Sequence, residues 1–156
     1  MNVPLDSAAP QDRLVCVSGT VPLNQPLVSL ENWAPNREEG LLLPVDAEPD
    51  ERFTDAELIA IDFPAFSDGR GLSLAVLLRT RLGFVGEVRA VGEINADLLH
   101  YLVRCGFDSF ELTNPTVHAD GSNAATGFNT LAPYGDNYQA SVLEREPAYR
   151  RVRRST

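Results

Sequence analysis

Three charged side chains interrupt apolar segments in the middle of this chain. Asp62, Arg89 and Glu111 each fall in a separate run that otherwise has the character of a buried strand. A charge in such a position is costly unless it has a partner. If the three strands are neighbours with Arg89 in the middle, the two carboxylates can flank its guanidinium. Two interpretations follow: a structural ion network, or an anion receptor in which the carboxylates keep Arg89 charged.

A second candidate is the glycine-rich sequence Ser67-Asp68-Gly69-Arg70-Gly71, which precedes a helical segment. Two glycines let backbone amides turn toward a ligand at a helix N-terminus, and the guanidinium of Arg70 offers a fork of donors for an anion. The alternative is a tight turn in which the Asp68 carboxylate caps local amides.

The elements that must position these residues alternate between strand and helix. Apolar runs at 58–63, 85–91 and 107–112 predict strands, and the segments 71–82 and 95–105 predict helices that end at Gly83 and Gly106. Strands that alternate with helices of this length imply right-handed crossovers and a parallel sheet. We therefore predict a small single-domain α/β protein with a mainly parallel sheet built from βα units.

In such sheets, ligands bind beyond the carboxyl ends of the strands. The loops 63–71 and 92–95, and the chain from residue 113 onward, would meet there. The candidate ligand-binding residues are Asp62, Asp68, Gly69, Arg70, Gly71, Arg89, Glu93 and Glu111. The helical spacing of the second helix puts His100 on its exposed face and Cys105 on its buried stripe.

The chain divides into three parts by composition. Residues 1–25 are rich in Pro, Ala and Asp and predict a flexible arm, in which the short apolar run 14–17 could add an edge strand. Residues 26–143 form the α/β domain, with further strands expected at 27–33 and 40–45. Residues 144–156 form a basic tail, which we expect to be disordered.

Charge is distributed unevenly between these parts. Residues 1–144 hold eight Arg against twenty-one acidic residues, whereas residues 145–156 hold five Arg against Glu146 alone. An acidic body does not suit a nucleic-acid surface, which needs clustered positive charge. We expect no nucleic-acid ligand.

The residue types also exclude several chemistries. The chain has no lysine, so a Schiff-base lysine and the lysine of a P-loop are both absent. Two histidines and two distant cysteines make no recognisable metal set. No motif for a dinucleotide, a flavin, haem or an iron–sulfur cluster is visible, so no cofactor is indicated. With no apolar run of membrane-spanning length and no secretory leader pattern, we expect a cytoplasmic protein.

The motifs between residues 58 and 112 together resemble a known family. They are Asp62-Phe63-Pro64, Phe66, Asp68-Gly69-Arg70-Gly71, Leu77-Leu78-Arg79, Gly86-Glu87, Arg89-Ala90-Val91-Gly92 and Arg104-Cys105-Gly106-Phe107-Asp108. This set resembles the bacterial family catalogued as domain of unknown function 934, whose members are often labelled as oxidoreductases involved in sulfite reduction. The family typically has Tyr where this chain has Leu72, and often Arg where it has Ala96, so no role is carried over at these two positions.

The resemblance implies an accessory protein of assimilatory sulfite or sulfate reduction. In this hypothesis the carboxyl-end crevice binds a small oxyanion through Arg70, Arg89 and loop amides. The alternative is a non-catalytic docking or scaffold protein whose partner is a sulfite reductase or another sulfate-assimilation enzyme. The sequence leaves a homo-oligomer open, and it leaves open whether the protein is an enzyme.

Overall fold

The computed structural model describes residues 14–17, 19–112, 141–143 and 145. Six strands form one sheet in the order β1-β6-β5-β4-β3-β2. Their bounds are β1 Leu14–Cys16, β2 Leu27–Ser29, β3 Gly40–Pro44, β4 Leu58–Phe63, β5 Glu87–Gly92 and β6 Ser109–Glu111. β1 runs antiparallel to β6 and every other neighbouring pair is parallel. The predicted α/β class with a mainly parallel sheet is therefore confirmed.

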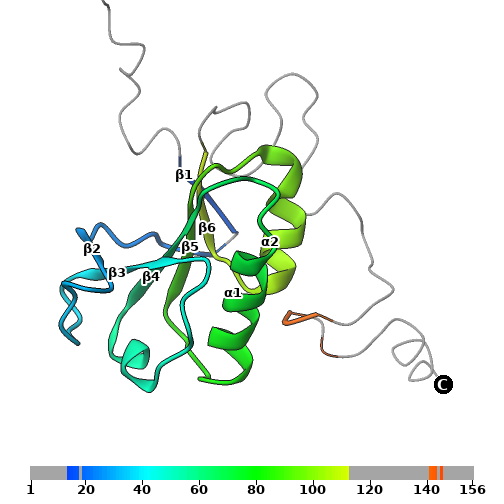
Figure 1. Cartoon of the computed structure of the whole chain (residues 1–156). Helices are drawn as coiled ribbons and strands as arrows, with labels where there is room; N and C mark the ends of the chain where they lie inside the picture. Colours follow the sequence, from blue (N-terminus) through cyan, green and yellow to red (C-terminus); the bar gives the residue numbers. More distant parts are fainter. Residues whose placement is uncertain (1–13, 18, 113–140, 144, 146–156) are drawn as a thin grey trace, which may run out of the picture.

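Two α-helices cover one side of this sheet (Figure 1). α1 spans Arg70–Thr80 between β4 and β5, and α2 spans Leu99–Cys105 between β5 and β6. Both crossovers step in the same direction along the sheet, and crossovers of one hand then place both helices on the same face. Two short 3-10 helices complete the described elements, η2 at Glu51–Asp55 and η3 at Ala96–Leu98.

The hydrophobic core lies between the helices and the sheet. Ile59 and Ile61 of β4 and Val88 of β5 belong to it, together with Leu78 of α1 and Leu102 of α2. Because side chains alternate along a strand, the residues between these core positions point to the opposite face of the sheet. In β5 those residues are Glu87, Arg89 and Val91, and in β4 they include Asp62.

The connection from β1 to β2 passes over that opposite face. β1 and β2 are the two edges of the sheet, so the chain between them must span its whole width (Figure 1). We call its residues 19–26 the crossing segment. The Leu23 backbone hydrogen-bonds to Glu87 and Arg89, whose side chains stand on the non-helical face. The crossing segment therefore covers the middle of that face.

Several predicted elements differ from the observed ones. The predicted strand 27–33 stops at Ser29, because the amides of Asn32 and Trp33 both donate to the Ser29 carbonyl in a turn and Trp33 is buried in the core. The helix predicted at 71–82 ends at Thr80. Residues 113–140, which were expected to meet the other loops at the carboxyl edge, and most of the basic tail lie outside the described residues.

His100 was predicted to be exposed, and that prediction is wrong. Its exposed fraction is 8%, and it lies beside the buried Leu99, Leu102 and Val103. The segment begins with the 3-10 turn η3 rather than as one continuous α-helix from Asn95. Leu99 and Val103 are buried as well as Leu102, so α2 is buried over a wider arc than the stripe that contains Cys105, and this arc includes His100.

Gly71 allows α1 to lie close to β4. A Cβ at this position would overlap the ring of Phe63 at the end of β4, whereas a Cβ at Gly69, two residues earlier, would meet nothing within 4 Å. The φ of Gly69 is −68°, which any residue can adopt. Close packing against Phe63 therefore requires a glycine at position 71, whereas neither space nor backbone conformation requires one at position 69.

We predict that Gly71→Ala lowers the free energy of unfolding by roughly 1–3 kcal/mol, because overpacking outweighs the gain in helix propensity. Gly69→Ala is the matched control and should cost less than about 1 kcal/mol, since only an N-cap preference is lost. Denaturant unfolding of both variants measures the difference. Equal midpoints for the two would contradict the close packing of α1 on Phe63.

Candidate functional site

The residues predicted in the glycine-rich loop form an ion pair at the start of α1. Arg70 Nη2 lies 2.7 Å from Asp68 Oδ2, and Arg70 Nε lies 3.0 Å from Oδ1. The Arg70 amide also donates to Asp68 Oδ1, so the Asp68 carboxylate does cap a local amide. The hydrogen bond from Arg70 holds the pKa of Asp68 below its usual range. The Arg70 side chain is 61% exposed, so this pair faces solvent.

The loops after β4 and β5 meet, as predicted. The Glu93 amide donates to the Phe63 carbonyl at 2.9 Å, which ties the two loops together. Gly92 has a φ of +89°, and a Cβ there would overlap the Phe63 carbonyl and come within 2.6 Å of Asp62 Oδ1. Asp62 and Glu93 are both exposed at this edge. Asp62 thus lies against the Gly92 backbone.

Arg89 lies in a different environment, on the non-helical face. Its Nη2 donates to Glu87 Oε1 at 2.7 Å and its Nε donates to the same oxygen at 3.1 Å. Nε also reaches Ser109 Oγ at 3.2 Å, and Nη2 reaches the Leu23 carbonyl at 2.8 Å. The Arg89 and Glu87 side chains are only 10% and 5% exposed.

Glu87 completes a closed network with these groups. Its Oε1 accepts from Ser109 Oγ at 2.5 Å, and its Oε2 accepts from the Leu23 amide at 2.7 Å. The Leu23 backbone therefore donates to the carboxylate and accepts from the guanidinium of one buried pair. We call Glu87, Arg89, Ser109 and the Leu23 backbone the buried network.

The expected partners of Arg89 are not the ones the structure shows. The register places Ala60 and Ser109 beside Arg89, and Asp62 two residues further along β4, opposite Val91. Glu111 lies at the exposed end of β6, opposite Leu14. The three charged residues share a face of the sheet, but the guanidinium is paired within its own strand.

The sequence contained part of the signal for this pairing. Glu87 and Arg89 are two residues apart in a strand, and side chains at that spacing share a face. Ser109 and Leu23 carry no comparable signal. Leu23 is sixty-six residues from Arg89 and takes part through its backbone, so its residue type gives no indication of the contact.

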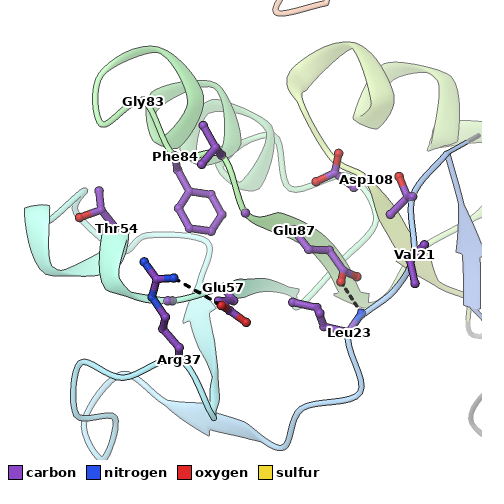
Figure 2. A pocket seen from close by; sticks show the side chains of 13 residues that line it. Val21, Leu23, Arg37, Thr54, Glu57, Gly83, Phe84, Glu87 and Asp108 are labelled. Atoms are coloured by element: carbon purple, nitrogen blue, oxygen red, sulfur yellow. Dashed lines mark hydrogen bonds and ion pairs between the residues drawn. The ribbon is translucent and has the colours of Figure 1, made fainter.

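A polar hollow of about 550 Å³ lies at the amino edge of the sheet, beside the crossing segment (Figure 2). Its walls include the carboxylates of Glu57, Glu87 and Asp108. Each carboxylate has an arginine partner: Glu57 lies 3.6 Å from Arg37, Glu87 pairs with Arg89, and Asp108 pairs with Arg79. The charges of this hollow are therefore compensated from within the protein.

Arg79 also holds the loops at this edge together. Its guanidinium makes five hydrogen bonds: two to the Gly106 carbonyl, one each to the carbonyls of Phe84 and Gly86, and one to Asp108 Oδ2. The same Asp108 oxygen accepts from the Val88 amide at 3.0 Å. Arg79, in the last turn of α1, thus ties the chain that leads into β5 to the chain that leads into β6.

Two apolar depressions lie on the helical side. The first, about 230 Å³, is at the carboxyl edge, and we call it the edge hollow. It is lined by Phe63, Phe66, Ser67, Asp68, Gly69, Leu72, Ile94, Leu98, Tyr101 and Leu102. Phe66 and Tyr101 are 55% and 60% exposed. Asp68 is the charged residue of this lining, and neither Arg70 nor Arg89 belongs to it.

The second depression, about 900 Å³, runs between α1 and α2, and we call it the helix groove. It is lined by Leu72, Val76, Arg79, Thr80, Gly83, Phe84, Val85, Tyr101, Arg104, Cys105, Ser141, Val142 and Arg145. The Val142 amide donates to the Arg104 carbonyl at 3.2 Å, which sets the segment 141–143 beside the end of α2. Sequence reasoning did not identify this groove.

The profile of one protein family, described as "Bacterial protein of unknown function (DUF934)", matches residues 40–149. The chain belongs to this family. No curated protein and no solved structure matches the chain. Within the described residues, no group of three or more His, Cys, Asp or Glu side chains could hold a metal ion. None of the helices that the structure describes has the length and hydrophobicity needed to cross a membrane.

The family match covers the predicted site residues and the side chains of the buried network, but not Leu23. Glu87, Arg89 and Ser109 all fall inside residues 40–149. Leu23 contributes only its backbone amide and carbonyl to the buried network. The network therefore requires the backbone to pass this point but does not require a particular side chain there.

We predict that Arg89→Ala destabilises this family member by about 3–5 kcal/mol, because it leaves the Glu87 carboxylate buried without its cation. Arg70→Ala is the matched control: it breaks an ion pair that solvent screens, and its unfolding midpoint should stay close to that of the wild type. Denaturant unfolding measures both. Equal effects of the two substitutions would contradict the buried network.

Proposed function

We propose that this chain is an accessory protein of sulfite or sulfate reduction that acts by docking a sulfite-reducing enzyme. The edge hollow is the observation that carries the docking part of this proposal. The link to sulfite reduction comes from the label often given to members of the family.

The chemistry of the edge hollow favours a protein partner over a small oxyanion. Its lining is mainly aromatic and aliphatic, and its charged residue is the acidic Asp68. An anion would meet apolar walls and a like charge there. An engineered cavity of about 150 Å³ lined by apolar side chains accepts benzene. A hollow of about 230 Å³ therefore has room for an aromatic or aliphatic side chain of a partner.

Two exposed aromatic residues support the same interpretation. Phe66 comes from the β4–α1 loop and Tyr101 from α2, and both line the edge hollow while remaining more than half exposed. Aromatic side chains beside a pocket are the residues that most often dominate binding energy in protein interfaces. Their position predicts that a partner inserts an apolar side chain between them.

We predict that Phe66→Asp weakens binding to the sulfite reductase of the same bacterium at least about tenfold, because it removes an aromatic anchor and adds a charge. The control is Val21→Asp. Val21 is an apolar residue that is 84% exposed, and it lies on the crossing segment, away from the edge hollow. Calorimetry or biolayer interferometry with the full chain gives Kd for each variant. No binding by the wild type, or equal loss in both variants, would refute the docking proposal.

Binding of a small oxyanion at the carboxyl edge is a second proposal, and the exposed guanidinium of Arg70 is what supports it. Arg70 lies at the start of α1, where backbone amides point outward, and Asp68 is its present partner. Arg89 is not part of this proposal, since its Nε and Nη2 groups donate within the buried network and its side chain is only 10% exposed.

We predict that sulfite or sulfate, at about one hundred times its Kd, stabilises the wild type by roughly 2.7 kcal/mol and leaves Arg70→Ala unchanged. Thermal unfolding in the presence of each anion measures this, with chloride at matched ionic strength as the control. A shift of the same size in Arg70→Ala, or no shift in the wild type, would exclude Arg70 as an oxyanion receptor.

A further inference from the structure

Carboxylates stand around the apolar edge hollow. Asp68 belongs to its lining, and Glu93 and Asp97 directly precede the lining residues Ile94 and Leu98. Because consecutive Cα atoms are about 3.8 Å apart, both residues lie next to the hollow. Glu93 and Asp97 are also exposed to solvent. We call Asp68, Glu93 and Asp97 the acidic rim.

Two of the three rim charges are available to a partner. Asp68 is paired with Arg70, so these two charges compensate each other. Within the part of the chain that the structure describes, neither Glu93 nor Asp97 forms an ion pair. The edge hollow therefore has mainly apolar walls and carries unbalanced negative charge at its margin.

The other arginines of α1 and α2 lie toward the opposite edge of the sheet. Arg79 is in the last turn of α1, and Arg104 is in the last turn of α2. At 1.5 Å per residue, Arg79 lies about 13 Å along the helix axis from Arg70, which begins α1 beside the hollow. Charge is therefore separated along the helical side, and the end that carries the edge hollow is the acidic one.

We propose that the edge hollow binds a basic segment of the docking partner, in which one apolar side chain enters the hollow and lysine or arginine residues on either side of it meet the acidic rim. This inference rests on the docking proposal, because it specifies the segment that the partner inserts. The apolar side chain supplies most of the binding energy, as buried anchors do at the centre of interfaces. The rim charges select the partner and speed its association, since exposed ion pairs add little energy individually.

Charge complementarity favours this occupant over other kinds of segment. An acidic segment would meet like charges at Glu93 and Asp97. A segment without charge would cover these carboxylates and remove part of their hydration without supplying a cation. A segment with basic residues beside its apolar anchor avoids both costs.

The experiment measures the affinity of the full chain for three short peptides by fluorescence anisotropy. The first peptide has one phenylalanine between two pairs of lysines, the second has glutamate in place of each lysine, and the third has alanine in place of the phenylalanine. We expect the first to bind at least about tenfold more tightly than either of the others at low ionic strength. Its advantage over the glutamate peptide should shrink at about 1 M salt, where charges are screened within about 3 Å.

Matched variants test whether the acidic rim and the hollow are responsible. Glu93→Gln combined with Asp97→Asn should weaken binding of the first peptide at least about fivefold, because both available rim charges are lost. Glu38→Gln combined with Asp55→Asn removes two exposed charges that precede β3 and β4, at the opposite edge, and should leave its affinity unchanged. Phe66→Ala should abolish the advantage of the phenylalanine peptide over the alanine peptide, since it removes a wall of the hollow.

The end of this chain is the other occupant that the experiment tests. It has the same chemistry as the proposed segment, with Tyr149 beside Arg150, Arg151, Arg153 and Arg154. Replacing these four arginines with glutamine in the full chain should leave the affinity for the first peptide unchanged. A gain of about tenfold would mean that the chain's own end competes for the hollow, and it would overturn the assignment to a partner.

The results for the peptides and for the reductase separate this inference from the docking proposal. Equal binding of the lysine and glutamate peptides, or equal loss in the two double variants, would overturn the inference. If the sulfite reductase binds the wild type and not Phe66→Asp while the peptides show no preference, docking stands and the basic segment is refuted. If the peptides show the preference and the reductase does not bind, docking of that enzyme is refuted and recognition of a basic segment is supported.

Discussion

The arrangement of this protein depends on one buried ion pair, Glu87–Arg89. Both charges are almost completely removed from solvent, which is costly unless the remaining donors and acceptors are satisfied. Ser109 and the backbone of Leu23 satisfy them. The pair therefore joins β5 to β6 and fixes the crossing segment over the non-helical face of the sheet.

This use of charge leaves the two faces of the sheet with different properties. In the buried network and at the amino edge, the carboxylates of Glu87, Glu57 and Asp108 are each paired with an arginine. On the helical side, the edge hollow and the helix groove are apolar and open, and Phe66, Tyr101 and Val85 remain exposed there. Candidate binding surfaces therefore lie over the helices, where hydrophobic contact is available, and not where the sequence concentrates its charges.

Local patterns predicted the framework well and the partners of buried charges poorly. The alternation of strand and helix gave the parallel order of β4, β5 and β6, and Gly71 and Gly92 lie at close approaches to Phe63. Arg89 does not pair with Asp62 or Glu111, because the register aligns it with Ala60 and Ser109, and both carboxylates lie two residues further along their strands. His100 was misplaced because α2 is buried over a wider arc than one stripe, which the spacing of residues along a single helix does not reveal.

The sequence by itself determined the family, the α/β class, and the meeting of the loops after β4 and β5, because these follow from local periodicity and from the geometry of parallel strands. Only the tertiary structure decided which charges are paired and where the surface is hollow. Both depend on chain segments far apart in sequence: Leu23 reaches Arg89 through its backbone, and Ser141, Val142 and Arg145 line the groove beside α2. Contacts made by the backbone do not depend on residue type, so the sequence does not reveal them. A groove depends on the space between elements, which no single element determines.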